Sequence, residues 1–432
     1  MRLTPALFSP TQHDWLRSLT AQHLRRISHA IGTKLSGTKP DIIRRINLGL
    51  DACQYKRAGL PDANDPNAPV TPREMRILSI DMGVHNLAYA NFIIPPDWRK
   101  TIDDPNRPRP ILTAWKKIAV QDIIHLKNGT EPRRPSKSAT KENRLTVSDE
   151  KEMPSVNPAV YAEYAYNLVS TLLDRHNPTH VLIERQRLRT GGGPNVFEWT
   201  LRVGMFESMI YSALYTLQRE RGLDVFVDAV DPARVVSTVQ EKQADALEDE
   251  LKKQVASGGL NINSLNSKRL RVDLVGRWLG TWAEKAQLAT ASISPYDSNV
   301  ELPDPSGKSG ADPDFRPEDE SDKYFKLVVD EKDEALRGFV LDYLEGWQRN
   351  LLRRRQDPNP ANRIEKKYNL AVKMHRESDI RKLDDLADCL VQGLTWLDWH
   401  IMRDKILRGG VDALTWHNIA IPNTKNLRKK RK

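Results

Sequence analysis

Apolar positions in the first fifty residues recur at intervals that are typical of helices. One apolar set comprises Leu16, Leu19, Leu24, Ile27 and Ile31. Its spacing predicts a helix that ends at Gly32, and a second helix is predicted from Asp41 to Leu50. Residues 55–74 are rich in Pro, Asp and Asn, which is typical of a linker. We therefore expect a small helical module over residues 1–54 that is joined to the rest by this linker.

The centre of the chain carries short apolar runs of the kind that form strands. Two of them, Arg76–Asp81 and Leu87–Ile94, are separated by a short turn and predict a hairpin, and residues 111–120 predict a third strand. After these, helices alternate with strands. The predicted elements are a helix from the cap Asn157 to about His176, a strand at His180–Glu184, a helix at Trp199–Arg219 and a strand at Asp224–Val230. Paired strands followed by strand–helix alternation predict an α/β fold with a mixed sheet.

The second half of the chain contains an insertion and further helices. Residues 237–325 have one amphipathic stretch, Lys268–Trp282, and an acidic segment at 302–323 that is typical of disorder. Helices are predicted at about 330–351 and 383–403. We expect one domain over residues 75–405, interrupted at about 237–325, and a basic tail at 406–432.

Charge and cysteine content narrow the class of protein. The 432 residues carry a net charge of +10, which favours a polyanionic partner such as nucleic acid. Two cysteines are too few for a disulfide framework or for a zinc site of their own. No apolar run of about 18 residues is present, so we expect no membrane span. The Arg-rich start weakly resembles a mitochondrial transit segment, although a DNA-binding helix over residues 20–31 is the interpretation that we prefer.

Acidic residues stand at the ends of predicted apolar elements. Asp81 and Glu184 each end a strand, and three more acids, Asp384, Asp385 and Asp388, begin the helix after residue 382. Spacings of three and four both place two acids on one helical face, so spacing leaves Asp384 and Asp385 as alternatives. Carboxylates from separate elements are the ligands that Mg²⁺ prefers, and two such ions can hydrolyse a phosphodiester. Such a site needs no organic cofactor.

Each of these acids also has a simpler explanation. Asp81 alone is typical of a turn, Glu184 could pair with Arg185 or Arg187, and Asp384 could only cap its helix. The joint pattern is a stronger signal than any of its parts.

Three motifs together carry a family resemblance. Ile77-Leu-Ser-Ile-Asp-Met-Gly-Val-His-Asn86, Val181-Leu-Ile-Glu-Arg-Gln-Arg187 and Lys382-Leu-Asp-Asp-Leu-Ala-Asp388 resemble the fungal mitochondrial Holliday junction resolvases. These are relatives of the bacterial RuvC resolvase within the ribonuclease H-like superfamily. The resemblance implies a mixed five-stranded sheet flanked by helices, and a mitochondrial location.

The same resemblance implies the site and the reaction. Asp81, Glu184, Asp385 and Asp388 would be the catalytic residues and the ligands of Mg²⁺, with Mn²⁺ able to substitute, and Asp385 is favoured over Asp384. The implied partner is four-way branched DNA. A homodimer would make one symmetric nick on each of two strands, leaving 5′-phosphate ends.

Two basic regions are candidates for DNA contact. The first module resembles a SAP motif, in which Lys39, Arg44 and Arg45 would reach phosphates; the alternative is a helical hairpin used in dimer packing. The residues after Glu184 would lie near the cut phosphate, with Leu188 as a possible apolar plug between bases, or they are ordinary surface charges. These residues are Arg185, Gln186, Arg187, Leu188 and Arg189.

Three other functions compete with the resolvase. The same carboxylates would serve a ribonuclease H-like nuclease on a hybrid or a plain duplex, since the surface selects the substrate. A junction-binding scaffold without catalysis is the second alternative. The third is an actin-like ATPase, because Asp81-Met-Gly83 followed by Asn86 resembles a phosphate-binding hairpin, but no second glycine-rich phosphate loop accompanies it.

Overall fold

The computed structural model describes residues 13–54, 74–83, 87–95, 109–120, 123, 157–186, 198–240, 267–291, 327–356 and 383–410. The chain divides into two compact units. Unit 1 contains residues 1–73, 229–267 and 391–432, and unit 2 contains residues 74–228 and 268–390. No described helix is long and apolar enough to cross a membrane.

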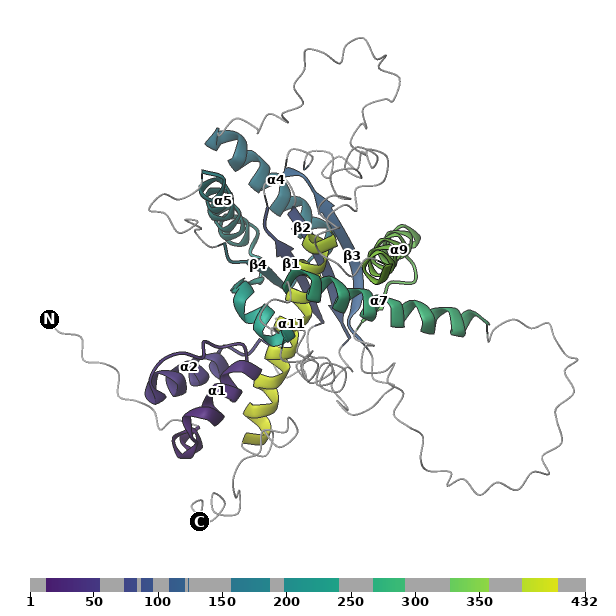
Figure 1. The fold of residues 1–432 in the computed structure, drawn as a ribbon. Coiled ribbons are helices and arrows are strands. Elements are labelled where there is room, and N and C mark those ends of the chain that lie inside the picture. Colours follow the sequence, from purple (N-terminus) through teal and green to yellow (C-terminus); the bar gives the residue numbers. More distant parts are fainter. Residues whose placement is uncertain are drawn as a thin grey trace, which may run out of the picture. The chain divides into compact units, whose positions relative to one another are not determined.

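Unit 2 is built around a mixed sheet, in which Figure 1 labels β1 to β4. The full strand order is β5-β4-β1-β2-β3-β6. The strands β1 (Met75–Asp81) and β2 (Leu87–Ile94) form the predicted antiparallel hairpin, in which Asp81 lies opposite Ala88. Strand β3 (Ile111–Ile118) continues the antiparallel pairing, whereas β4 (His180–Glu184) runs parallel to β1. The neighbour of β4 is β5, which covers Phe226–Val230. The predicted mixed α/β sheet is therefore confirmed.

The expected number of five strands is wrong by one, since the sheet of the described chain has six. The additional strand β6 is only Val328–Val329, which is too short to be recognised from an alternation of side chains. It forms because Val328 N donates to Pro110 O at 2.9 Å and Asp330 N donates to Leu112 O at 3.0 Å along the edge of β3. Only tertiary contact with β3 makes this segment a strand.

Helices α4 (Pro158–His176) and α5 (Glu198–Arg221) cover one face of the sheet (Figure 1). The predicted start of α4 is confirmed, because the Asn157 side chain accepts a hydrogen bond of 3.0 Å from Ala159 N. The sheet residues in this core alternate along each strand and include Leu78, Ile80, Val181 and Ile183. Residues between them therefore point to the opposite face.

The opposite face is contacted through Trp115 on β3. Its ring lies against Phe339 and Tyr343 of α9 (Glu334–Gln356), with centroid distances of 5.6 and 4.7 Å. Its indole N–H donates to Leu386 O of α11 (Leu383–Gly409) at 3.0 Å. Helix α7 (Ser267–Ala291) packs closely on α9, where Gly276 accommodates the ring of Trp347. The helix predicted at Lys268–Trp282 thus exists and extends nine residues further, to Ala291.

Unit 1 combines the N-terminal helices with the later part of α11. A short 3₁₀ helix (Asp14–Ser18), which the sequence did not predict, precedes α1 (Ala21–Ala30) and α2 (Lys39–Asp51). Their apolar side chains form one core with Met402 and Ile406 of α11. Gly32 follows α1 with φ +69°, and a Cβ there would lie 2.2 Å from the Trp399 ring. The glycine is therefore required both for the left-handed turn and for this close approach.

Candidate active site

The position of Asp81 and Glu184 follows from the alternation of side chains along paired strands. Ile80 pairs with Ile183 in the parallel register of β1 and β4, so the two acids follow as neighbours. Ile80 and Ile183 belong to the core beneath α4 and α5. Asp81 and Glu184, one residue further on, therefore point to the opposite face of the sheet.

The first turns of α11 bring three more acids to this face. Trp115 anchors them through its bond to Leu386 O, and the buried Cys389 thiol also donates to that carbonyl at 3.2 Å. Lys117, two residues along β3 and on the same face as Trp115, lies 3.0 Å from Asp385 Oδ2. The two groups form an ion pair but not a hydrogen bond, because Asp385 Oδ2 has no hydrogen-bond partner.

The structure brings the four predicted carboxylates together. Burial raises the pKa of Asp81 well above its usual range, and a hydrogen bond with Glu184 and the charge of Glu184 raise it further. The charges of Asp388 and Asp385 act in the same direction. Asp384 is not among the causes of the raised pKa of Asp81, whereas its charge acts on Asp388.

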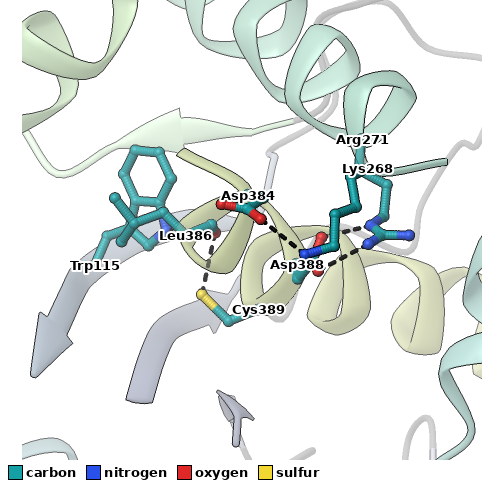
Figure 2. A network of polar contacts seen from close by, with 7 residues as sticks. All are labelled: Trp115, Lys268, Arg271, Asp384, Leu386, Asp388 and Cys389. Carbon is teal, nitrogen blue, oxygen red and sulfur yellow. Dashed lines mark hydrogen bonds and ion pairs between the residues drawn. The ribbon is translucent and has the colours of Figure 1, made fainter. Parts of the chain in front are cut away.

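Helix α7 supplies two cations to this cluster that the sequence did not single out (Figure 2). The Arg271 guanidinium donates to both carboxylate oxygens of Asp388, with Nη2 2.8 Å from Oδ2. Lys268 Nζ lies 2.9 Å from Asp384 Oδ2. Spacing along the chain carries no signal for contacts across more than 110 residues, because only tertiary packing brings α7 to α11.

The donor set fits a divalent cation chemically. It consists of hard carboxylate oxygens that are partly buried beside one another, where their repulsion is costly without a compensating positive charge. Burial also raises the pKa of Asp388, although Arg271 lowers it. Among the described residues, no group of three or more His, Cys, Asp or Glu side chains has the geometry to hold an ion as it stands.

Of the two described residues after Glu184, Arg185 is exposed and Gln186 contacts the cluster. Gln186 Nε2 lies 3.5 Å from Glu184 Oε2, and also 3.5 Å from Met82 O. Its backbone N–H donates to Glu207 Oε1 of α5 at 3.4 Å, and burial raises the pKa of Glu207. The amide of Gln186 is thus placed to orient Glu184. Arg187, Leu188 and Arg189 lie outside the described residues.

The basic residues of the first module differ in their surroundings. Lys39 Nζ donates to Arg17 O at 2.8 Å, and Arg45 donates to Ser36 O. Both cations thus hold neighbouring backbone, whereas Arg44 is exposed on α2. The three residues lie on α2 of unit 1.

The fold and the site define an α/β protein with a partly buried carboxylate cluster at the ends of β1 and β4 and the start of α11. A family model described as "Mitochondrial resolvase Ydc2 / RNA splicing MRS1" matches residues 77–406. The chain therefore belongs to this family. The mitochondrial location that the resemblance implied agrees with this description and with the name of the relative below.

Individual proteins that resemble this chain share less than a third of its residues in the aligned regions. The "Cruciform cutting endonuclease 1, mitochondrial" of Schizosaccharomyces pombe is 27% identical over 196 residues, or 45% of this chain. The chain spans only 55% of the length of that curated relative. The crystal structure of the yeast mitochondrial Holliday junction resolvase Ydc2 is 19% identical, with a TM-score of 0.42, and covers 90% of this chain and 97% of its own. RuvC of T. thermophilus in complex with a Holliday junction substrate is 15% identical, with a TM-score of 0.22 over 39% of this chain and 72% of its own.

Proposed function

We propose that the protein is an endonuclease that resolves four-way DNA junctions by metal-dependent hydrolysis. The observation that carries this proposal is the convergence of Asp81, Glu184, Asp385 and Asp388 from three elements of one unit. Membership of a family described as a resolvase family supports the choice of substrate.

The four carboxylates would hold two divalent cations, Mg²⁺ or Mn²⁺, through their oxygens. When bound, these ions supply an activated water and neutralise charge on the phosphate. Hydrolysis would join a water oxygen to phosphorus and break the bond to the 3′ oxygen, which would take up a proton, so the products would be a 5′-phosphate and a 3′-hydroxyl. The protein contributes orientation: Gln186 lies against Glu184, and Trp115 holds the first turn of α11.

Substrate contact and assembly are further parts of the proposal. Arg44 of the first module and Arg185 beside the site are candidates for phosphate contact, which positions a protein on DNA without reading its sequence. Lys39 and Arg45 would act together with Arg44. Resolution of a junction needs two cuts on symmetric strands, so we propose a homodimer with one site in each protomer.

A non-catalytic alternative is favoured by one finding, because the family description also includes RNA splicing. A binding protein would not need clustered carboxylates, whose mutual repulsion costs stability. The presence of all four acids in one cluster therefore favours the nuclease.

The decisive experiment compares wild type with Asp81→Asn on a four-way junction in Mg²⁺. Loss of one ligand oxygen should lower the cutting rate by about a thousandfold or more, equal to about 4 kcal/mol of transition-state stabilisation, while junction affinity changes little. Asp342→Asn, an exposed carboxylate on α9, is the matched control and should cut like wild type.

The substrate is tested by offering junction, linear duplex and RNA–DNA hybrid at one salt concentration, because phosphate contacts make affinity depend strongly on salt. Paired symmetric nicks on the junction support the proposal. Preference for the hybrid would favour another ribonuclease H-like nuclease, and junction binding without cutting in Mg²⁺ or Mn²⁺ would favour the scaffold.

A further inference from the structure

The contact between Arg271 and Asp388 is a pairing of charges inside the candidate site (Figure 2). The guanidinium uses Nε and Nη2 to bond the two oxygens of one carboxylate. Only 10% of the Arg271 side chain and 22% of the Asp388 side chain are exposed. Because both oxygens of Asp388 are bonded to Arg271, a metal ion and this guanidinium compete for the same atoms.

Contacts with α9 fix the helix that carries Arg271. Trp347 of α9 packs onto α7 at Gly276, and its indole N–H donates to Asp273 Oδ1 at 3.2 Å. Asp273 lies two residues after Arg271 on the same helix. A guanidinium stays protonated throughout the physiological pH range, so loss of a proton cannot remove this charge.

The acids of α11 are thus paired with cations from unit 2 in the structure. Lys117 lies beside Asp385, Lys268 beside Asp384, and Arg271 beside Asp388. Lys268 is 60% exposed and Lys117 approaches a single oxygen, whereas Arg271 is buried and bidentate. Arg271 is therefore the cation whose removal would most change the affinity of the cluster for another cation.

We infer that Arg271 is the resident counter-ion of Asp388, and that a divalent cation binds only by displacing it. The inference rests on the proposed function, because it takes Asp388 as a metal ligand. Arg271 acts through Asp388 and is a positioning residue. It holds the carboxylate and offsets part of the repulsion within the cluster until metal binds, and it thereby weakens the apparent metal affinity.

The test measures Mn²⁺ binding to the full chain without DNA, by electron paramagnetic resonance of free Mn²⁺. Arg271→Met keeps much of the side-chain length and removes the charge, and should bind Mn²⁺ about tenfold more tightly than wild type, equal to about 1.4 kcal/mol. Arg269→Met is the matched control. It changes the same residue type on the same helix at a side chain that is 44% exposed and lies 3.6 Å from Asp273. Its Mn²⁺ affinity should equal that of wild type.

A second pair of variants separates competition from a structural effect. In an Asp388→Asn background, Arg271→Met should no longer tighten Mn²⁺ binding, because the shared carboxylate is absent. If circular dichroism shows that Arg271→Met is unfolded, Arg271→Lys is used instead. Lysine keeps the positive charge but cannot bond both oxygens of Asp388 at once, so this variant should bind Mn²⁺ more tightly than wild type by a smaller factor.

Unchanged or weaker Mn²⁺ binding by a folded Arg271→Met, or by Arg271→Lys where Met does not fold, overturns the inference. That result leaves the proposed function intact if wild type binds Mn²⁺ and cuts junctions. Failure of wild type to cut in saturating metal would reject the proposed function instead, while the binding data would still decide whether Arg271 competes for Asp388.

Discussion

Burial determines the protonation of several side chains in unit 2. Asp81 and Asp388 have raised pKa values because a buried carboxylate is penalised when it is charged. For His176, at the end of α4, burial lowers the pKa, because the charged form of a base is the protonated one. Burial, followed by the charges of Arg175 and Lys116, lowers the pKa of His176 to about 4. Its ring lies 5.6 Å from the ring of Tyr89 on β2. Neutral His176 is therefore part of the folded packing.

His176 should make the protein sensitive to mild acid. Its pKa is about 4 when folded and 6.5 in the unfolded reference, so the unfolded chain binds more protons between these values. The contribution to stability is fully present above pH 6.5 and is lost as pH falls toward 4. The full shift corresponds to about 3 kcal/mol.

Urea unfolding of wild type and His176→Asn at pH 7.5 and pH 4.5 measures this effect. Wild type should lose more free energy of unfolding than the variant over this range, by up to about 3 kcal/mol. Equal losses in the two proteins would show that His176 is not held neutral by the fold.

At the scale of elements, helix packing decides which carboxylates meet which cations. Helix α7 approaches α9 closely because Gly276 has no side chain, and a Cβ there would lie 2.2 Å from the Trp347 ring. Gly280, one turn later on α7, has nothing within 4 Å of the same added atom. The two glycines therefore differ in packing although both lie inside one helix.

Alanine at these two positions should have opposite effects. Gly276→Ala forces α7 away from Trp347 and should lower the free energy of unfolding by about 2 kcal/mol. Gly280→Ala gains helix propensity without a clash and should raise it by up to about 1 kcal/mol. Chemical unfolding of the two variants under one condition measures the difference, and equal effects would contradict the close packing of α7 on α9.

At the scale of the molecule, helices α1 and α2 do not form a core of their own but share one with α11 inside unit 1. Their apolar core includes Met402 and Ile406, more than 340 residues later in the chain. Arg403 reinforces the contact by donating from Nε and Nη2 to Ile31 O at 3.0 and 2.9 Å. Trp399 occupies the space that Gly32 leaves open. The N-terminal helices thus cover one face of the C-terminal part of α11.

Deletion of residues 1–54 should therefore expose an apolar surface. Each large side chain uncovered costs about 1.5–3 kcal/mol, so we expect aggregation in size-exclusion chromatography and increased binding of the dye ANS. Arg44→Ala is the matched variant. It removes one exposed cation of the module outside this core, should leave ANS binding unchanged and should weaken junction binding at low salt. A deletion protein that stays monodisperse without added ANS binding would show that the module is dispensable for folding.

Local patterns in the sequence were sufficient for most elements and for the two acids that end strands, but they left Asp384 and Asp385 as alternatives. The predicted bounds of β4 are confirmed at both ends, since an apolar run of three residues between His180 and Glu184 has few alternative structures. Asp81 was predictable for the same reason, because it ends the apolar run of β1. Long-range contacts have no such local signature: β6 exists only beside β3, and Arg271 gains its role only from the approach of α7 to Asp388.

The sequence by itself determined the hairpin, the alternation of strands and helices, and the acids at their ends, because each depends on neighbours within a few residues. Tertiary structure decided which cations neutralise those acids and which distant segment completes the first module. The physical reason is that burial and charge pairing depend on distances in space, and residues 271 and 388 become neighbours only after the helices that carry them have packed.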